Sequence, residues 1–395
     1  MRPGAGGVLL VGPCPPPHGG VSVHVAGLRR ELEDAGVPCA LLDAKPGAAP
    51  TGDECLRTPG AIGLLRAIGR HGRHGWLIHT HINGHNHKSW LLALAAGLAG
   101  ATAPARLLTV HSGMAPDHLE GGGARLLARI ACRLHDRIIC VNEEIRRAVA
   151  AAGVPEARLR VLAAAVPSRR TPVELPDPLA RWLRGRTPLL SAALAFEPEY
   201  RFDLLAAAVA ALRRDHPDIG CVVMGSGSRQ PQARELIAGS GLEEAVCLTG
   251  DVDHDTCLQL VAESDLFVRT NDRDGDALSV REALMLGVPV VATDVGSRPP
   301  GTILFAAGDF QAMLAAIRRT LAGAGRRSAP GPHRREPPGH AERGQPPFEP
   351  AARAPAAEPA AMSELLSLYD RLAGPSGLRP TGAVPRSAWS GRSTR

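Results

Sequence analysis

Short apolar runs alternate with amphipathic segments from the start of the chain, and this alternation predicts βαβ units around a parallel sheet. In the first half, each apolar run is short enough to be one buried strand, and helical patterns separate the runs. The predicted strands are 8–11, 39–42, 76–79, 107–110, 138–141 and 159–162; the predicted helices are 20–35, 62–68, an apolar one after 88, 124–133 and one from 142.

The same pattern begins again after a proline-rich segment, 167–187, which has the composition of an interdomain linker. Two Rossmann-like, doubly wound α/β halves are therefore predicted. The strands of the second half are predicted at 189–193, 221–224, 246–248, 266–268 and 288–292; its helices are predicted at 202–214, 229–237, 255–262, 278–286 and 312–321.

The composition changes abruptly at residue 325 to Pro, Arg, Ala and Gly, which predicts disorder. One amphipathic helical pattern survives beyond it, from Met362 to Leu372, and we expect it to dock on a domain. The predicted organisation is an N-terminal domain 1–166, a linker 167–187, a C-terminal domain 188–324, a disordered linker 325–361, a returning helix 362–373 and a tail 374–395.

The net charge of +6 raises the question of a nucleic-acid partner. The segment 325–395 alone carries 11 Arg against 6 acidic residues, so the body of the protein is nearly neutral. Aromatic residues make up only 3% of the chain, which disfavours recognition of bases by stacking. No nucleic-acid partner is expected.

The cysteines and the apolar segments predict where in the cell the protein is located. The eight cysteines form no CxxC pair and lie mostly in apolar runs, which favours a reduced environment over a disulfide framework. The apolar stretch 7–12 is followed by prolines, so we expect no cleaved leader. The longest apolar run, 90–105, is shorter than the roughly 20 residues that span a bilayer. A cytoplasmic protein is expected, with peripheral attachment to the inner membrane face left open.

The segment 266–294 contains the most informative chemistry. A strand leads into a polar loop with Asp274 and Asp276, and a helix follows with Glu282 in its second turn. Ligands of such sheets bind at the carboxyl ends of the strands, and the free amides of a helix start suit a phosphate. Two carboxylates eight residues apart could then hold hydroxyls of one elongated ligand. The alternative is that Asp276 only caps the helix and Glu282 lies on its surface.

This segment resembles the Glu-x7-Glu signature of the retaining glycosyltransferases of family 4, which have the GT-B fold of two facing Rossmann-like domains. Asp274 and Glu282 occupy the two signature positions, with Asp in place of the first Glu. The resemblance extends over residues 8 to about 323. It includes the glycine loop Gly19-Gly20, Thr109-Val110-His111, Met224-Gly225-Ser226-Gly227 and Leu248-Thr249-Gly250.

The resemblance implies roles for several residues. Glu282 would hold the ribose hydroxyls of a nucleotide diphosphate sugar, Asp274 a hydroxyl of the transferred sugar, and the Gly20 backbone the diphosphate, while His111 would lie at the reacting face of the sugar. The family's usual lysine after the first strand of the second domain is missing, which makes Arg201, and then Arg269, the candidate phosphate contacts. The further donor-binding candidates are Gly19, Gly225, Gly227, Asp276, Ala277, Leu278 and Ser279.

A group of four histidines, His79, His81, His85 and His87, follows the third predicted strand. Alternate residues of a strand share a face, so a zinc site is one interpretation. Contacts to the acceptor or to phosphate are a second, and a solvated loop is a third. No carboxylate or cysteine with ligand spacing accompanies the group, and no metal site is predicted.

The predicted function is transfer of a sugar from a nucleotide diphosphate sugar to a glycan, lipid-linked or small-molecule acceptor on the N-terminal side, with retention of configuration and without a metal or other cofactor. A nucleotide-sugar epimerase of the same fold and a non-catalytic nucleotide-sugar-binding scaffold are the alternatives.

Overall fold

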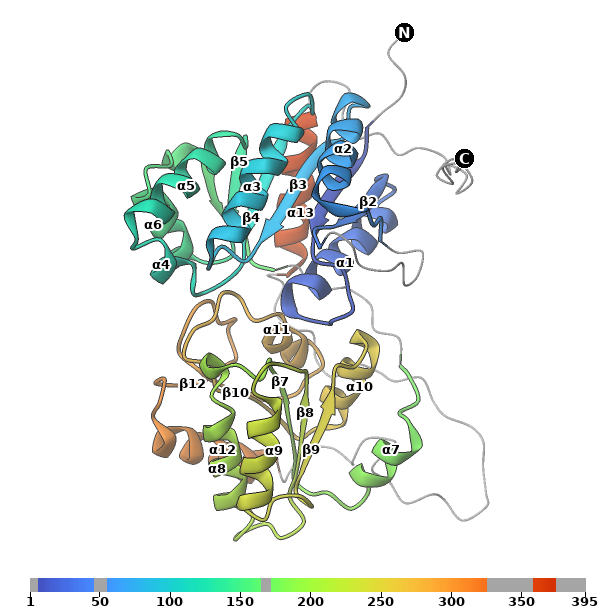
Figure 1. Ribbon diagram of the computed structural model, residues 1–395. Helices are drawn as coiled ribbons and strands as arrows, with labels where there is room; N and C mark the ends of the chain where they lie inside the picture. The colour runs from blue at the N-terminus through green and yellow to red at the C-terminus, as the bar shows by residue number, and fades with distance from the viewer. Residues whose placement is uncertain (1–5, 46–54, 165–171, 325–357, 374–395) are drawn as a thin grey trace.

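The computed structural model describes residues 6–45, 55–164, 172–324 and 358–373. Within these residues the chain forms two domains, each built on a six-stranded, all-parallel sheet, one above the other in Figure 1. The strand orders are β2-β1-β3-β4-β5-β6 and β12-β11-β10-β7-β8-β9. The predicted pair of Rossmann-like halves is confirmed.

The first sheet alternates its side chains between two helix layers. Val8 and Leu10 of β1 pack with α1 and α13, whereas Leu9 and Val11 pack with α2 and α3. A strand buried on both faces explains the continuous apolar runs of the sequence. The elements are β1 (Val8–Gly12), α1 (Gly20–Asp34), β2 (Cys39–Asp43), α2 (Gly60–Arg73), β3 (Leu77–Ile82), α3 (His87–Ala99), β4 (Arg106–Val110), α4 (Ala115–His118), α5 (Gly122–Arg133), β5 (Arg137–Cys140), α6 (Glu143–Ala151), the 3₁₀ turn η1 (Glu156–Arg158), β6 (Leu159–Val161) and α13 (Glu358–Ala373).

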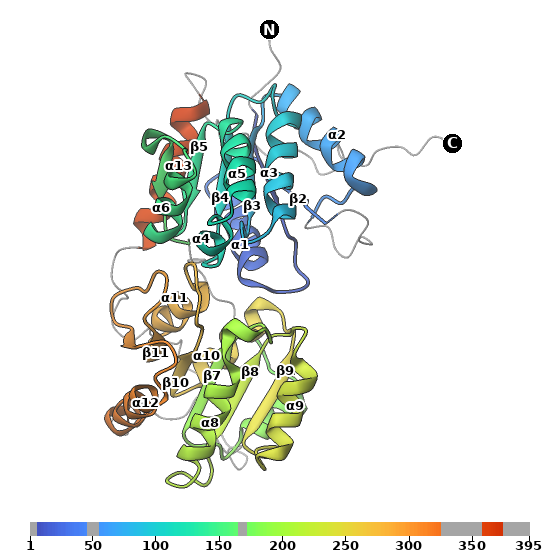
Figure 2. The ribbon, with the colours of Figure 1, turned by 60° about the vertical axis from the view of Figure 1, so that its left-hand side comes forward.

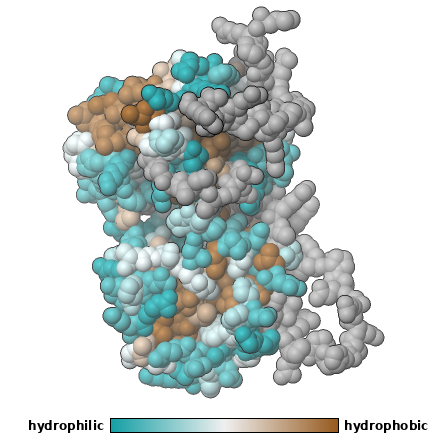
Figure 3. Space-filling model, turned by 45° about the vertical axis from the view of Figure 1, so that its right-hand side comes forward, coloured by the Kyte–Doolittle hydropathy of each residue, from teal (hydrophilic) through white to brown (hydrophobic). Residues whose placement is uncertain are grey.

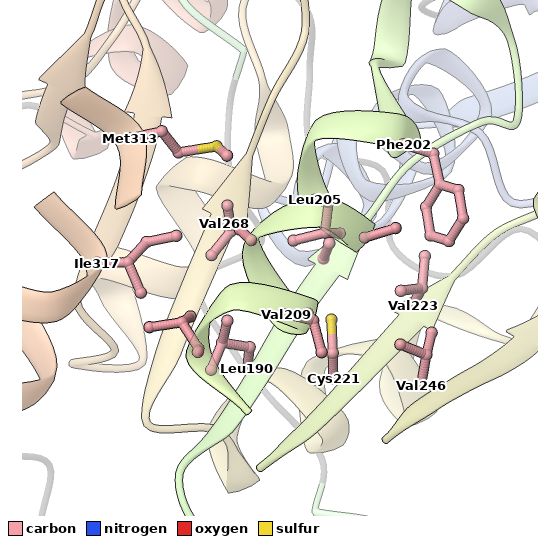
Figure 4. Packing of buried hydrophobic residues seen from close by; sticks show 14 of the residues in the cluster. Leu190, Phe202, Leu205, Val209, Cys221, Val223, Val246, Val268, Met313 and Ile317 are labelled. Carbon is pink, nitrogen blue, oxygen red and sulfur yellow. The ribbon is translucent and has the colours of Figure 1, made fainter. Parts of the chain in front are cut away.

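The second sheet follows the same rule. Leu190 and Val223 lie in a cluster with α8, α9 and α12, shown in Figure 4, while Leu189 and Val222 face α7, α10 and α11. Its elements are α7 (Asp177–Leu183), β7 (Leu189–Ala193), the 3₁₀ turn η2 (Pro198–Tyr200), α8 (Phe202–Leu212), β8 (Gly220–Met224), α9 (Gln230–Gly239), β9 (Val246–Gly250), α10 (His254–Glu263), β10 (Leu266–Arg269), α11 (Leu278–Met285), β11 (Val290–Thr293), β12 (Ile303–Phe305) and α12 (Phe310–Ala324).

The C-terminal helix α13 packs on the first domain, as its amphipathic pattern predicts (Figures 1 and 2). Leu365, Leu368 and Tyr369 are buried there. The Tyr369 hydroxyl lies 2.5 Å from Nδ1 of His79 on β3, and Nε2 of His79 lies 2.7 Å from the Thr109 hydroxyl. The residues just before α13 and the tail after it fall outside the described part of the chain.

Several features differ from the sequence expectations. Strand β12 was not predicted; it lies at the edge of the second sheet, and only one of its three residues is buried. The four-residue helix α4 was not predicted either. Helix α7 lies inside the predicted linker, where Leu183 is fully buried against the second sheet. Cys14 and Cys55 form a disulfide, so the expectation of reduced cysteines is wrong for this pair. The two cysteines are 41 positions apart in the sequence, and no local signal indicated their pairing.

Among the described residues, every helix is too short or too polar to cross a membrane.

Candidate functional site

A cavity of about 530 Å³ lies between the two domains. Segments that follow β1, β3 and β4 line it from the first domain, and segments that follow β7, β8, β9 and β10 line it from the second. Both sheets therefore present the carboxyl ends of their strands to one space, as expected of ligand sites in parallel α/β sheets. The volume suits a ligand of the size of a nucleotide sugar.

Two helix N-termini face this cavity. Helix α1 begins at Gly20 after the N-cap residue Gly19, and α11 begins at Leu278 after Ala277; these residues and Ser279 all line the cavity. Neither helix has an acidic residue in its first turn. A side chain at Gly20 would meet nothing within 4 Å, so its backbone is open to a ligand. Unneutralised helix starts of this kind attract phosphate groups.

Glu282 lies one turn into α11 and lines the cavity. Its Oε1 is 2.5 Å from Nε2 of His254 at the start of α10. Burial alone would lower the pKa of His254, but the hydrogen bond and charge of Glu282 outweigh burial and raise it. Glu282 is only 4% exposed, so the surface-residue alternative is wrong and His254 fixes the orientation of the carboxylate.

Asp274, the other signature carboxylate, also lines the cavity but is held by two arginines. Its Oδ2 lies 2.9 Å from Nε of Arg269 and 3.0 Å from Nη2 of Arg298. Burial would raise the pKa of Asp274, and the two guanidinium groups outweigh burial and lower it. Arg269 also donates to the Ala193 carbonyl at 2.8 Å, and its guanidinium lies over the Tyr200 ring. Arg269, a candidate phosphate contact, therefore lies at the cavity and is paired with Asp274.

Asp276 does not cap α11, because the N-cap residue is Ala277 and no side chain caps the helix. Asp276 instead accepts from Nε of Arg281 at 2.9 Å and from the Ala164 amide at 2.5 Å. The second contact joins the two domains, since Ala164 follows β6 of the first sheet. The helix start thus keeps its amides free of this carboxylate.

His111 lies at the end of β4 beside two further histidines. Its Nε2 is 3.0 Å from Nδ1 of His81 on β3, and the His24 ring of α1 lies 5.1 Å from the His111 ring, centroid to centroid. Burial, followed by the charges of neighbouring histidines, lowers the pKa of His81 and of His111 well below the usual value. These imidazoles are therefore neutral at pH 7 and can serve as hydrogen-bond partners of a sugar hydroxyl.

The four acceptor-side histidines do not gather in one place. His79 is buried under α13, and burial lowers its pKa to about 3. His81 is buried beside His111, and His85 lines the cavity with Nδ1 3.2 Å from the Ser112 hydroxyl. His87 is exposed and stacks edge-on against His118. Only His81 and His85 of this group therefore lie close to the candidate site.

Of three further donor-binding candidates, one lines the cavity and two do not. Gly225 lines the cavity, where a Cβ would lie 2.0 Å from the Leu194 carbonyl. Gly227 packs against the backbone of Phe196 and lies outside the cavity wall. The Arg201 side chain pairs with Asp203 and Asp272 and is likewise not among the lining residues.

Close backbone contact holds the domains together at the cavity. A Cβ on Gly275 would lie 1.9 Å from the His111 carbonyl, and one on Gly113 would lie 2.1 Å from the Asp274 carbonyl. The Asn142 side chain donates to the Gly275 carbonyl at 2.9 Å. The loop that carries Asp274 therefore lies directly on the strand end that carries His111.

Sequence reasoning missed several residues of the site. His254 and Arg298 lie outside the segment 266–294, one on each side, and His24 lies far from it along the chain; no motif marks any of the three. Lys45, which follows β2, also lines the cavity. It is one of only two lysines in the sequence, and this scarcity was the one signal that could have drawn attention to it.

Two family models match the chain, one in each domain. Residues 18–170 match the family model described as Glycosyltransferase Family 4, and residues 187–323 match the one described as Glycosyl transferases group 1. The two segments together cover most of the chain, one for each domain. The chain thus belongs to the group 1, family 4 glycosyltransferases.

Curated relatives match over part of their length. The exopolysaccharide phosphotransferase of Streptomyces coelicolor is 28% identical over 230 residues, which are 55% of this chain and 23% of that protein. The lipopolysaccharide core biosynthesis mannosyltransferase LpsB of Rhizobium meliloti is 33% identical over 128 residues, which are 29% of this chain and 36% of that protein. The chain thus spans no more than about a third of the length of either relative.

Among solved structures, HepE of Anabaena in complex with UDP-glucose superimposes with a TM-score of 0.61. The alignment covers 81% of this chain and 91% of that chain at 16% identity. At this identity the similarity establishes the fold, which is GT-B.

Proposed function

We propose that the protein transfers a sugar from a nucleotide diphosphate sugar to an acceptor bound on the side of the first domain. The observation that carries the proposal is the convergence of two unneutralised helix starts, at Gly20 and Leu278, on one interdomain cavity that also contains Glu282. This arrangement offers amides for a diphosphate and a carboxylate for ribose hydroxyls within one ligand length.

The donor is held mainly by the second domain. Glu282 accepts hydrogen bonds from the ribose hydroxyls, and His254 keeps its carboxylate in position. The α11 amides bind the diphosphate from one side, and the Gly19-Gly20 backbone binds it from the other. Asp274 lies where it can accept from a sugar hydroxyl, with Arg269 and Arg298 balancing its charge.

The proposed reaction retains the anomeric configuration. The acceptor oxygen attacks the anomeric carbon on the face that the diphosphate leaves, the bond from that carbon to the phosphate oxygen breaks, and this oxygen takes the acceptor proton. Negative charge that develops on the leaving group is stabilised by helix-start amides, so the step requires no metal ion. The closed interdomain contact at Gly275 excludes water and limits hydrolysis of the donor.

A lipid-linked acceptor is the class that the surface favours. Figure 3 shows hydrophobic surface on part of the first domain. In this domain, the helices α2, α3 and α5 carry large exposed apolar side chains. Helices α2 and α5 also carry arginines, and positive charge beside apolar side chains suits a membrane with anionic lipids. The exposed side chains are Ile62, Leu91, Leu98, Leu126 and Ile130.

The test is incubation of the purified full chain with a panel of nucleotide diphosphate sugars, beginning with UDP-glucose, with and without lipid-linked and soluble acceptors. Acceptor-dependent release of the nucleoside diphosphate supports transfer, and NMR of the product should show the donor's anomeric configuration. An inverted product would overturn the proposed mechanism.

The other outcomes identify the alternatives. Interconversion of the sugar without net release identifies an epimerase. Binding without either reaction identifies a scaffold. Release of a nucleoside monophosphate, with the sugar phosphate moved to the acceptor, identifies a phosphotransferase.

Glu282→Ala is the matched test of the donor site. Loss of hydrogen bonds to a charged group should weaken nucleoside diphosphate binding roughly 10- to 100-fold. The control is Glu235→Ala, an exposed glutamate on α9. Equal affinity in the Glu282 variant and the wild type would refute the assignment of Glu282.

A further inference from the structure

We propose that His24, His81 and His111 form a binding site for a single divalent transition-metal ion of the zinc class. One ring nitrogen from each of the three residues lies within 4.8 Å of the other two. The residues come from α1, from β3 and from the segment after β4, and the sequence separates them by up to 87 positions. Only the folded first domain brings them together.

The spacing of the nitrogens suits one ion. Zinc binds imidazole nitrogen at about 2.0–2.1 Å with tetrahedral geometry, so two ligand nitrogens lie roughly 3.4 Å apart. Nδ1 of His81 and Nε2 of His111 are 3.0 Å apart, a few tenths of an ångström from that value. The His24 nitrogen needs a modest side-chain rotation to close the set.

The second ring nitrogen of His81 does not face the proposed ion. His81 is 1% exposed, and its Nε2 is a buried atom without a hydrogen-bond partner within the described residues. The nitrogen of His81 that faces His111 is Nδ1, and Nδ1 would bind the ion, so Nε2 would carry the proton of the metal-bound ring.

Space for a further ligand adjoins the cluster. His111 and His24 line the large interdomain cavity, which leaves a fourth coordination position open to a solvent molecule or a ligand. A separate hole of about 20 Å³ is lined by His24, His79 and Thr109, enough for about one water molecule. A set of three imidazoles with one open position is a coordination pattern of zinc.

This site differs from the zinc site that the sequence analysis considered among the four clustered histidines. Of the four clustered histidines, only His81 belongs to it, because His79 bonds Tyr369 and His87 points to solvent. The other two ligands, His24 and His111, come from elsewhere in the chain.

Occupation of the site has a consequence for activity, and this consequence rests on the proposed function. A bound ion would hold the ring nitrogen of His111 at the face assigned to the reacting sugar. Ion and donor sugar would then compete, and zinc would act as a reversible inhibitor of transfer.

The binding test needs neither donor nor acceptor. The full chain is dialysed against a chelator and titrated with Co²⁺, and Zn²⁺ affinity is measured by competition with a chelating dye. We expect one ion per chain with the visible absorption bands of cobalt in nitrogen coordination. Near-ultraviolet bands of sulfur coordination would place the ion on cysteines and overturn the proposal.

The matched variants are His24→Gln and His81→Gln, with His74→Gln as the control at an exposed histidine. Loss of a ligand should weaken Zn²⁺ binding by more than about 100-fold, the upper range for loss of an outer-shell partner. Equal weakening in His74→Gln, or none in the two buried variants, would contradict the site.

X-ray absorption of the zinc-loaded wild-type chain counts the imidazole ligands of the ion. It requires no variant, so it tests the proposed site even if the buried variants fail to fold. Three imidazoles are expected, and fewer than three would overturn the site. Because binding is measured without substrate, a failure of the proposed transfer reaction leaves this result intact.

Discussion

Nε2 of His254 lies 2.5 Å from Oε1 of Glu282, and this pair joins the first turn of α10 to the second turn of α11. Both side chains line the interdomain cavity. A histidine that donates to the carboxylate leaves the other lone pairs of Glu282 free to accept from a ligand. The pair thus stabilises the second domain and holds the carboxylate of the proposed ribose contact in place.

The first prediction concerns the pH dependence of this pair. Because the folded-state pKa of His254 is raised above 6.5, its stabilising contribution is complete below pH 6.5 and is lost as the pH rises through the folded pKa. The stability difference between wild type and His254→Gln should therefore be largest below pH 6.5 and shrink above it. Thermal unfolding across this range checks the prediction.

His216→Gln, outside the cavity in the same domain, is the control for this experiment. A stability difference for His254→Gln that stays constant with pH would show that the pair does not titrate as proposed.

The second prediction compares the stability lost when a buried carboxylate and an exposed one in the same loop are each replaced by an amide. Asp274→Asn leaves the guanidinium groups of Arg269 and Arg298 without their carboxylate partner, which should destabilise the protein by about 3–5 kcal/mol. Asp272→Asn breaks only a surface pair with Arg201 and should change stability by less than about 1 kcal/mol. Denaturant unfolding of the two isosteric variants compares these values.

Similar stability of the two variants would mean that the Asp274 ion pairs are not formed in solution. Asp274→Ala should also reduce discrimination among donor sugars, provided that the variant folds.

The third prediction concerns contact between the domains. Gly275→Ala introduces a Cβ that would lie 1.9 Å from the His111 carbonyl, so the loop and the strand end must separate. We expect a larger radius of gyration by small-angle X-ray scattering and faster donor hydrolysis, because water gains access to the cavity. Gly239→Ala on α9, where a Cβ meets nothing within 4 Å, should change neither. Unchanged scattering in both variants would refute close contact at Gly275.

The fourth prediction concerns the Cys14–Cys55 disulfide, which anchors the loop before Gly19 to the segment after β2. Closing a loop of this length should stabilise the first domain by about 2–4 kcal/mol. A thiol reductant should therefore lower the unfolding temperature of the wild type but not that of the double variant Cys14→Ser, Cys55→Ser. An equal response of the two proteins to the reductant would argue against the bond.

Much of the fold could be predicted because strands buried on both faces leave continuous apolar runs, and helices that cover one face of a sheet leave a 3.6-residue period. The signature segment was visible because Asp274, Asp276 and Glu282 lie within nine consecutive residues. The return of α13 was also predictable, since an isolated amphipathic helix needs a surface on which to bury its apolar stripe.

Pairings between distant side chains could not be predicted in this way. Nothing local to Glu282 indicates His254, and nothing local to His81 indicates His24, because each contact depends on how two strands and their crossover helices pack. The same holds for Arg298 on Asp274 and for Cys14 with Cys55. Arg201 shows the opposite case, since its position in the sequence suggested a phosphate contact but its nearest carboxylates hold it outside the cavity wall.

The sequence by itself determined the two parallel α/β domains, the helix starts and the carboxylates of the candidate donor site, because local periodicity and short-range spacing encode them. The tertiary structure alone decided which of those groups are free and which are paired: Asp274 with two arginines, Glu282 with His254, and three histidines around one point. The physical reason is that burial and charge pairing depend on neighbours in space. These neighbours come from helices, strands and loops that are separated along the chain and meet only when each domain is folded.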